Sequence, residues 1–467
     1  MSSRFKMASR ARLVALAVGA GALCSFAMAD TSMAAAPTAG SACQTDGKIN
    51  GRGATFQTNA TRALIDGYRI DVCGPVGSGG DAGTNMLAYN YASATGNTGS
   101  GNGQKAASCR TDAFAGTDIP YDQATLAQLN GAPGATGSCG ITFTPPFQPN
   151  APLTFPDPAD VQANVMSFPV AGSSVALPVN LQAADCGGTK PASLQFSVAN
   201  VSKIFGGDIA NWNDPRLVAE NASLTNCNVA ITRVVRLDKS GTTQVFKNFL
   251  SNADGARSGA TCDAANSWTN LALDSNNTAW PTGAGCSNLV RPTTTGGAPV
   301  VSLVRSTPGA VGYADLADAV VAGTPALIQS NVRNATDTQY VGAANGTAAN
   351  CDFATSLPGS TNSDAVGLNP GGDNWAFDAA TRHDDVTFKG SQYPICGLTF
   401  GLVYTGLNGN SGTGAIARLS ANQRRTLYSY FTYVFSPAGQ SRLNAARYAA
   451  LPAAFLTKLR LGFQTNF

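Results

Sequence analysis

The spacing of apolar positions along the chain predicts repeated units of strand, loop and helix. Residues 229–235 form an apolar, β-branched run that predicts a strand. In residues 244–250 the apolar side chains recur four positions apart, which predicts a helix. Similar units are predicted in 49–68 and in 113–129. Because such units pack helices against sheets, we expect an α/β protein with ligand loops at the carboxyl ends of its strands.

The remaining segments fit the same alternation. Residues 165–181 are extended and apolar enough to pass between two lobes, and residues 197–205 predict a helix. A further helix is predicted from Thr84, a strand in 393–404 and a set of helices in 420–461. The segments that are rich in Gly, Ser, Asn or Pro, or otherwise resemble exposed insertions, are 95–108, 131–158 and 340–395.

The first 29 residues have the composition of a secretory signal peptide. Four basic residues precede an apolar run over 13–26, and Ala27-Met28-Ala29 supplies small residues for cleavage after Ala29. We therefore expect a soluble protein that is periplasmic or secreted. The segment carries four of the 30 basic residues and none of the 27 acidic ones, which leaves the other 438 residues with a net charge of −1. This charge gives no support for a nucleic-acid partner.

Cysteine and histidine usage narrows the chemistry further. Ten cysteines remain after the predicted signal peptide, and an even number in an oxidising compartment predicts disulfides. Sequence neighbours such as Cys186 with Cys227, or Cys262 with Cys286, are possible pairs, and the connectivity stays open. No Cys-x-x-Cys pair occurs, and the single histidine, His383, lies in a polar stretch. We expect no metal site, no cofactor and no histidine-based catalytic triad.

Residues 236–243 concentrate anion-binding groups between a predicted strand and a predicted helix. Their sequence is Arg-Leu-Asp-Lys-Ser-Gly-Thr-Thr. The N–H groups at the start of the helix and the positive end of its dipole would face an anion. Arg236 can donate to two oxygens of that anion at once. The alternative is a capped helix start that follows an ordinary surface arginine.

Four loops in a fixed order resemble the periplasmic phosphate-binding proteins of ABC phosphate uptake (PstS-like), including the related secreted proteins that begin Asp-Ile-Asn-Gly. These loops are Gly-Ala-Thr-Phe at 53–56, Gly-Ser-Gly-Gly at 77–80, Gly-Thr-Asp at 116–118 and the Arg-Leu-Asp-Lys-Ser-Gly-Thr segment at 236–242. Further agreement lies in residues 204–209, 212–215, 308–313, 439–440, 448 and 451–452. The resemblance spans nearly all of the chain after the signal peptide, apart from the insertions.

The resemblance implies a two-lobe clamshell of the periplasmic-binding-protein type, with two hinge crossings and phosphate buried in the cleft. We assign residues 30–172 and 314–467 to the first lobe and residues 173–313 to the second. A length of 438 residues is too great for one core and suits two.

The same resemblance implies phosphate ligands from both lobes. Asp118 would accept the proton of hydrogen phosphate, which sulfate lacks at neutral pH, so that one carboxylate provides selectivity; its alternative role is a helix N-cap. Asp238 would orient Arg236. The full set of implied ligands is Thr55, the backbone N–H of Phe56, Ser78, Asp118, Arg236, Ser240, Gly241 and Thr242. The chain departs from the family pattern at Lys239, Gln57 and Thr117, where glycine, proline and serine are usual.

The expected function is capture of inorganic phosphate by a non-enzymatic monomer that delivers it to the permease of an ABC transporter. One alternative is a secreted phosphatase, with Ser240 or Thr242 as nucleophile and Asp118 as base. Another is a surface or secretion-associated protein that reuses the fold and binds a macromolecule through its insertions.

Overall fold

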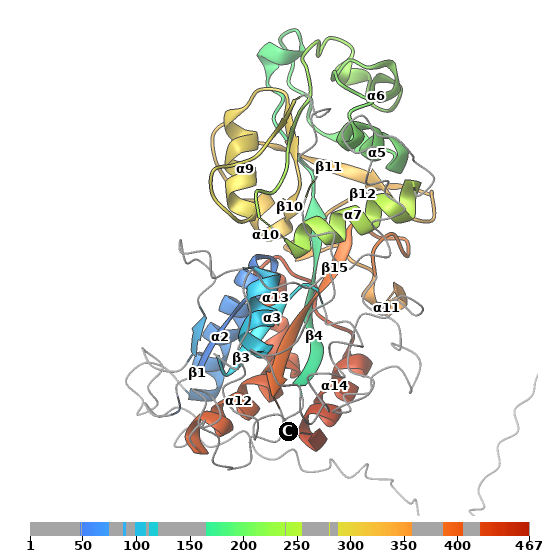
Figure 1. The fold of residues 1–467 in the computed structure, drawn as a ribbon. Helices are drawn as coiled ribbons and strands as arrows, with labels where there is room; N and C mark the ends of the chain where they lie inside the picture. The colour runs from blue at the N-terminus through green and yellow to red at the C-terminus, as the bar shows by residue number, and fades with distance from the viewer. Residues whose placement is uncertain are drawn as a thin grey trace, which may run out of the picture. The chain divides into compact units, whose positions relative to one another are not determined.

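The computed structural model describes residues 47, 49–73, 87–89, 99–108, 112–119, 165–238, 240–254, 280, 288–356, 386–404 and 421–466. Within these residues the chain forms two main β-sheets, each packed with helices (Figure 1). The predicted signal peptide, Ser78, Lys239 and His383 lie outside the described residues.

The first sheet has the strand order β10-β4-β15-β3-β1-β2. Strand β1 pairs in parallel with β2 and β3, whereas β15 is antiparallel to both β3 and β4. Strand β2 occupies part of the segment where a helix was predicted from Thr84, so that prediction is wrong there; pairing with β1 overrides the local pattern. The strands are β1 (Ile49–Gly53), β2 (Leu87–Tyr89), β3 (Phe114–Thr117), β4 (Val165–Ala176), β10 (Ala314–Asp315) and β15 (Cys396–Tyr404).

An aromatic cluster joins the first sheet to its helices. Phe168 on β4 has its ring centroid 5.0, 5.3 and 5.8 Å from those of Phe431, Phe435 and Phe463. These edge-to-face contacts bury large apolar rings that come from distant parts of the chain. The helices that gather around this sheet are η2 (Thr55–Gln57), α2 (Thr58–Cys73), α3 (Ser100–Ser108), α12 (Ala421–Val434), α13 (Pro437–Ala445) and α14 (Ala453–Asn466) (Figure 1).

The second sheet has the order β12-β11-β5-β9-β7-β8, with β6 also paired to β11. Its strands are β5 (Pro178–Val179), β6 (Leu194–Phe196), β7 (Thr232–Val234), β8 (Leu289–Val290), β9 (Ala310–Gly312), β11 (Ile328–Arg333) and β12 (Tyr340–Gly342). Strand β7 is parallel to both β8 and β9. The parallel pairing places the end of β7, and therefore the residues after it, at one edge with the end of β9.

The helices that pack with the second sheet begin and end at residues that favour helix ends. Ser197 caps α5 (Val198–Gly206), and Gly207 closes it with a φ of 86°. Trp212 is buried, and its indole N–H donates to the carbonyl oxygen of Gly309 at 2.8 Å. The remaining helices are η4 (Ala183–Cys186), α6 (Pro215–Glu220), η5 (Ala222–Leu224), α7 (Gly241–Asp254), α9 (Gly297–Ser306) and α10 (Leu316–Ala319).

The chain passes directly between the two sheets. Strand β4 is followed after one residue by β5 of the second sheet, and β9 is followed after one residue by β10 of the first. Strands β11 and β12 then pair in the second sheet, although residues 328–342 fall within the range assigned to the first lobe. The lobe boundaries and the hinge role of these passages stay predictions.

The structure of residues 99–108 differs from the prediction made for this segment. The prediction of an exposed insertion over 95–108 is wrong for helix α3, which buries Gln104, Ala106 and Ala107. A Cβ atom added to Gly103 would overlap the backbone oxygen of Gly116. The glycine-rich composition that resembles a loop instead allows the helix to lie directly against β1 and β3.

Part of the predicted insertion over 340–395 is also ordered structure. Strand β12, the hairpin β13 (Ala344–Asn345) and β14 (Ala348–Ala349), and helix α11 (Phe353–Ser356) occupy its first residues. Phe353 is buried in the main core. The expectation of a wholly exposed insertion is therefore wrong for 340–356.

Two disulfides lie in the described part of the chain, Cys186–Cys227 and Cys351–Cys396. The first confirms one of the pairs that the sequence suggested, while Cys262 and Cys286 lie outside the described residues. None of the described helices combines the length and the apolar composition that crossing a membrane requires.

Candidate functional site

Arg236 is the centre of one half of the candidate site. It follows β7, and its side chain is 1% exposed. Two of its nitrogens donate to one carboxylate: Nε to Asp238 Oδ1 at 2.8 Å and Nη2 to Asp238 Oδ2 at 2.5 Å. Such a two-point contact fixes the plane of the guanidinium. This geometry agrees with the predicted role of Asp238 in orienting Arg236.

The same guanidinium reaches both predicted ligand loops. Its Nη2 donates to Thr55 Oγ1 at 3.0 Å, although the two residues are 181 positions apart. Its Nη1 lies 3.4 Å from Thr242 Oγ1, at the start of α7. Arg236 therefore joins the loop after β1 of the first sheet to the loop after β7 of the second.

Electrostatics keeps Arg236 charged. Burial lowers the pKa of the guanidinium, but the adjacent Asp238 carboxylate, with smaller contributions from Tyr313 and Asp315, holds the pKa above its ordinary value. The backbone N–H of Gly296, which precedes α9, lies 3.4 Å from Asp238 Oδ1 as an additional donor. The site thus contains a permanent buried cation whose orientation is fixed.

The start of α7 lies beside this arginine. Ser240 and Thr242 are both buried, and the backbone N–H of Thr242 donates to Ser240 Oγ at 3.1 Å. Helix α7 runs over 14 residues, so its first N–H groups carry the full partial positive charge of a helix dipole. Ser240, Gly241 and Thr242 occupy the positions from which an anion is bound at a helix N-terminus.

Asp118 is the centre of the other half of the site. It follows β3, and its carboxylate is buried among hydroxyl groups. Thr399 Oγ1 donates to Asp118 Oδ1 at 2.8 Å, and Ser100 Oγ donates to Asp118 Oδ2 at 3.1 Å. The backbone N–H of Asp118 donates to Ser100 Oγ at 3.1 Å. Ser100 is the first residue of α3, so a second helix N-terminus faces this carboxylate.

The environment of Asp118 changes its acidity. Burial raises the pKa of this carboxyl to about 7, while the hydroxyls of Thr399 and Ser100 and the charge of Arg236 oppose the rise. A carboxyl with such a pKa exchanges a proton near neutral pH. It is suited to accept a proton from a ligand that carries one.

Gly241 brings the two halves together. A Cβ atom built on Gly241 would overlap the side chain of Asp118. The backbone of α7 therefore lies against the carboxylate, which only a residue without a side chain allows. Thr55, Asp118, Arg236 and the start of α7 meet at one place, and their role as phosphate ligands stays a prediction.

Phe56 contributes through its position on the same loop. Its ring is fully buried, and the Tyr448 hydroxyl donates to its backbone carbonyl oxygen. These contacts hold the short helix η2, which also carries Thr55. The predicted role of the Phe56 N–H as a ligand stays a prediction.

Sequence reasoning missed three residues at this place: Ser100, Thr399 and Tyr313. The Tyr313 hydroxyl accepts from the backbone N–H of Arg236 at 3.3 Å and lies 2.7 Å from Thr243 Oγ1. The Gly-Ser-Gly-Asn-Gly run at 99–103 carries the same Gly-Ser-Gly pattern as 77–80 and was the available signal for Ser100. No local pattern distinguishes Thr399 from the rest of β15.

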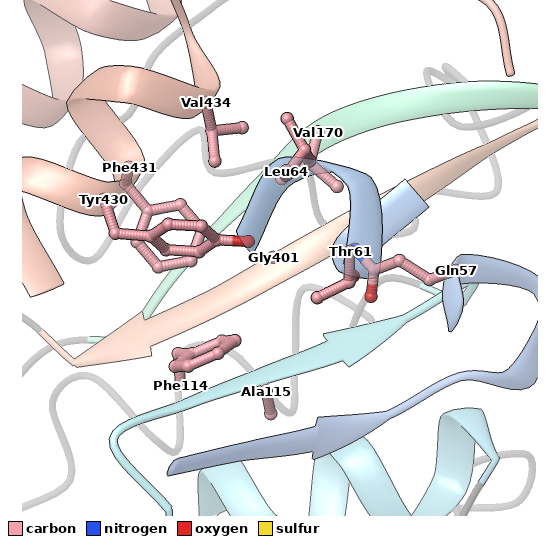
Figure 2. Close-up of a pocket in the computed structure, with 10 residues that line it drawn as sticks. All are labelled: Gln57, Thr61, Leu64, Phe114, Ala115, Val170, Gly401, Tyr430, Phe431 and Val434. Carbon is pink, nitrogen blue, oxygen red and sulfur yellow. The ribbon is translucent and has the colours of Figure 1, made fainter. Parts of the chain in front are cut away.

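A separate small cavity lies between α2, α12 and the first sheet (Figure 2). Its volume is about 10 Å³, which is room for roughly one water molecule. Its lining is mostly apolar, with Phe114, Val170 and Phe431 among the residues, and contains no charged side chain. This cavity is therefore a packing defect of the core and not the anion site.

Metal chemistry gains no support from the described residues, among which no group of three or more His, Cys, Asp or Glu side chains is placed to hold a metal ion. His383 lies outside them.

Comparison with a family model gives a match over residues 37–345 to the PBP superfamily domain. Among curated proteins the chain is 32% identical over 156 residues to the phosphate-binding protein PstS of Haemophilus influenzae, covering 33% of this chain and 40% of that protein. It is 30% identical over 159 residues to PstS of Xylella fastidiosa strain 9a5c, covering 34% and 37%. The matches thus span about two fifths of the length of these relatives.

Solved structures give a longer match. The chain aligns with the phosphate-binding protein of Stenotrophomonas maltophilia at a TM-score of 0.56 and 18% identity, over 90% of this chain and 95% of that one. It aligns with the high-affinity periplasmic phosphate-binding protein PfluDING at a TM-score of 0.53 and 21% identity, over 89% and 93%. At such identities the likeness concerns the fold. The chain belongs to the PBP superfamily, and its two sheets with their helices form the two-lobe α/β fold of the periplasmic binding proteins.

Proposed function

We propose that this protein is a non-enzymatic solute-binding protein that captures inorganic phosphate between its two lobes. The observation that supports the proposal best is the meeting of Arg236, Asp118 and Gly241 at one place. A dehydrated phosphate needs many donors to replace its water, and it needs one acceptor for its proton. This place offers both.

The donors would come from both lobes. The second lobe would supply the guanidinium of Arg236 and the N-terminus of α7, with Ser240, Gly241 and Thr242. The first lobe would supply Thr55 and Phe56, together with Ser100 at the N-terminus of α3. Ser78 stays a prediction, since it lies outside the described residues.

Asp118 would provide selectivity. An ionised carboxylate accepts the proton of hydrogen phosphate but repels sulfate, which carries no proton at neutral pH. The buried surroundings of Asp118 strengthen that repulsion, because an unpaired charge in a low dielectric is costly.

The lobes would close on the ligand, because only the closed state makes contacts from both sides. We assign 30–172 to the first lobe and 173–313 to the second, and we place 328–342 with the second lobe because of the pairing of β11 and β12. The rest of 314–467 stays with the first lobe.

The signal-peptide composition and the names of the relatives support a proposal of export and transport. The curated relatives are named phosphate-binding protein PstS. We propose that this protein is periplasmic or secreted, acts as a monomer and delivers phosphate to the permease of an ABC transporter. The macromolecule-binding alternative would be favoured if deletion leaves phosphate uptake unchanged and the protein is found outside the cell.

A phosphatase would need a hydroxyl nucleophile in contact with a base. Instead, Ser240 Oγ accepts from the Thr242 N–H at 3.1 Å, and Asp118 is held by Ser100 and Thr399. Among the described contacts neither proposed nucleophile is hydrogen-bonded to Asp118, which favours binding over catalysis.

Titration calorimetry of protein stripped of ligand tests the proposal. We expect phosphate to bind with measurable heat and sulfate to bind much more weakly. The Asp118→Asn variant should narrow the preference for phosphate over sulfate, because an amide can donate to sulfate. Absence of heat and of competition with phosphate would rule the function out, and an unchanged ratio in Asp118→Asn would remove that role from Asp118.

A further inference from the structure

Thr399 lies in β15, between β3 and β4, and its side chain is fully buried. Its hydroxyl donates to Asp118 Oδ1 at 2.8 Å, while the backbone oxygen of Thr117 lies at 3.5 Å. A threonine hydroxyl has one proton to donate, and the shorter contact to a carboxylate is the stronger one. Thr399 therefore donates its single hydroxyl proton to the carboxylate of Asp118.

The strand pairing at this point is irregular. The register between β15 and β4 shifts between Thr399 and Phe400, so that Thr399 pairs with Ala171 and Phe400 with Pro169. A shift of this kind changes the direction of side chains near it. Pro169, the β4 residue that pairs with Phe400, has no backbone N–H, so the irregular pairing costs no hydrogen bond from this residue.

The two oxygens of Asp118 have different surroundings. Oδ1 accepts from Thr399, whereas Oδ2 accepts from Ser100 at 3.1 Å. Oδ2 is also the carboxylate oxygen nearest to a Cβ built on Gly241. Oδ2 therefore faces the start of α7, where the proposed phosphate would lie.

We propose that Thr399 is a positioning residue that sets the specificity of this site. Its hydroxyl donates to Oδ1 of Asp118 and thereby orients Oδ2 of the same carboxylate toward the ligand, where Oδ2 accepts the proton of the ligand. The inference rests on the proposed function. Thr399 does not touch the ligand in this arrangement and acts only through Asp118.

The hydroxyl also bears on the charge of Asp118. The groups that act on this carboxyl are Ser100 from α3, Thr399 from β15 and Arg236 after β7, and Tyr448, beyond α13, interacts with it electrostatically. Of the groups that lower the pKa of Asp118, Thr399 has the largest effect. Without the hydroxyl, a larger fraction of Asp118 would be protonated at neutral pH, and that fraction would donate to sulfate and could not accept the proton of phosphate.

The test compares Thr399→Val with Thr399→Ser by titration calorimetry with phosphate and with sulfate across pH. Valine keeps the shape of threonine and removes the hydroxyl. We expect Thr399→Val to weaken phosphate binding about tenfold near pH 6 and less than about twofold near pH 8.5, because one hydrogen bond to a charged group is lost. The ratio of phosphate affinity to sulfate affinity should also fall in Thr399→Val. Thr399→Ser should keep the phosphate affinity and this ratio of the unmodified protein.

Thr426→Val is a matched control, since Thr426 is equally buried but its hydroxyl donates to the backbone oxygen of Asn422 in α12, at 3.0 Å. We expect it to leave affinity and selectivity unchanged. Carbon-13 titration of the Asp118 carboxyl in ligand-free protein gives a second readout, in which Thr399→Val should raise the pKa by about one unit.

A loss in Thr399→Val that is the same at every pH and is not rescued by serine would overturn the inference, as would an unshifted carboxyl titration. Failure of the unmodified protein to bind phosphate would instead contradict the proposed function. The carboxyl titration separates the two cases, since it needs no phosphate.

Discussion

The two halves of the site bury opposite charges in different ways. Arg236 is held by a carboxylate, with Asp238 on two of its nitrogens. Among the residues that the structure describes, the Asp118 carboxylate accepts hydrogen bonds from the neutral hydroxyls of Ser100 and Thr399, and Arg236 acts on it through its charge. Both side chains are buried and both pKa values rise, with opposite consequences for charge: the rise keeps Arg236 charged, whereas a pKa of about 7 leaves the Asp118 carboxyl partly protonated near neutral pH.

The difference shows what a counter-ion does for a buried charge. With a carboxylate partner beside it, Arg236 has a pKa above its ordinary value despite burial, whereas hydroxyl donors compensate only part of the solvation that Asp118 loses. One half of the site is therefore a fixed cation, and the other is a group that exchanges a proton. An anion that carries a proton fits both halves at once.

The largest expected effect is that of Arg236→Ala. It leaves Asp238 without its partner and should lower the free energy of unfolding by about 3–5 kcal/mol. Phosphate binding should be lost as well. Chemical denaturation and titration calorimetry measure the two effects.

The chain offers a matched control for this change. Arg216 and Asp214 are also two residues apart and also make a two-point contact, at 2.8 and 2.7 Å, but the Arg216 side chain is 43% exposed. Arg216→Ala should cost less than about 1 kcal/mol because water screens the pair. Equal losses in the two variants would contradict the contrast between buried and exposed pairs.

The second effect is a pH dependence that comes from Asp118. Because its folded pKa lies above the unfolded value, the native state keeps this proton longer than the unfolded chain does. Its stabilising contribution is complete below about pH 4 and is lost as pH rises toward about 7. Relative to Asp118→Asn, ligand-free protein should lose about 2–4 kcal/mol of unfolding free energy over that range.

Denaturation of both proteins in parallel across pH measures this difference. Asp315 is also buried, and its raised pKa adds a slope of the same sign, but that slope is common to both proteins and cancels. A difference that does not change with pH would show that Asp118 is ionised throughout.

The smallest effect expected at the site is that of Gly241→Ala. Gly241 does not have a positive φ, so alanine can adopt its backbone conformation. The loss of affinity arises only from the contact between the new Cβ atom and the Asp118 side chain. We expect phosphate affinity to fall by about 1–3 kcal/mol, as overpacking usually costs. Gly101→Ala on α3 is the control, since open space surrounds that position. Equal affinities in the two variants would argue against close approach of α7 to Asp118.

Local patterns predicted much of this arrangement and failed in identifiable places. The strand and helix around residues 229–250 and the helix predicted over 197–205 depend on neighbours in sequence, and all are present. The contact of Arg236 with Asp238, which the family resemblance implied, is present as well. Helix α3 was missed because its glycines have the composition of a loop. Their function in packing is visible only when Gly103 lies on Gly116.

The sequence by itself determined which residue types gather at the ends of strands and helices, because capping, periodicity and charge act over a few positions. It also determined the superfamily. Only the tertiary structure decided that Thr399, 281 residues from Asp118, supplies a donor to its carboxylate. It likewise decided the acidity of Asp118, since desolvation depends on all the chain segments that exclude water from one point.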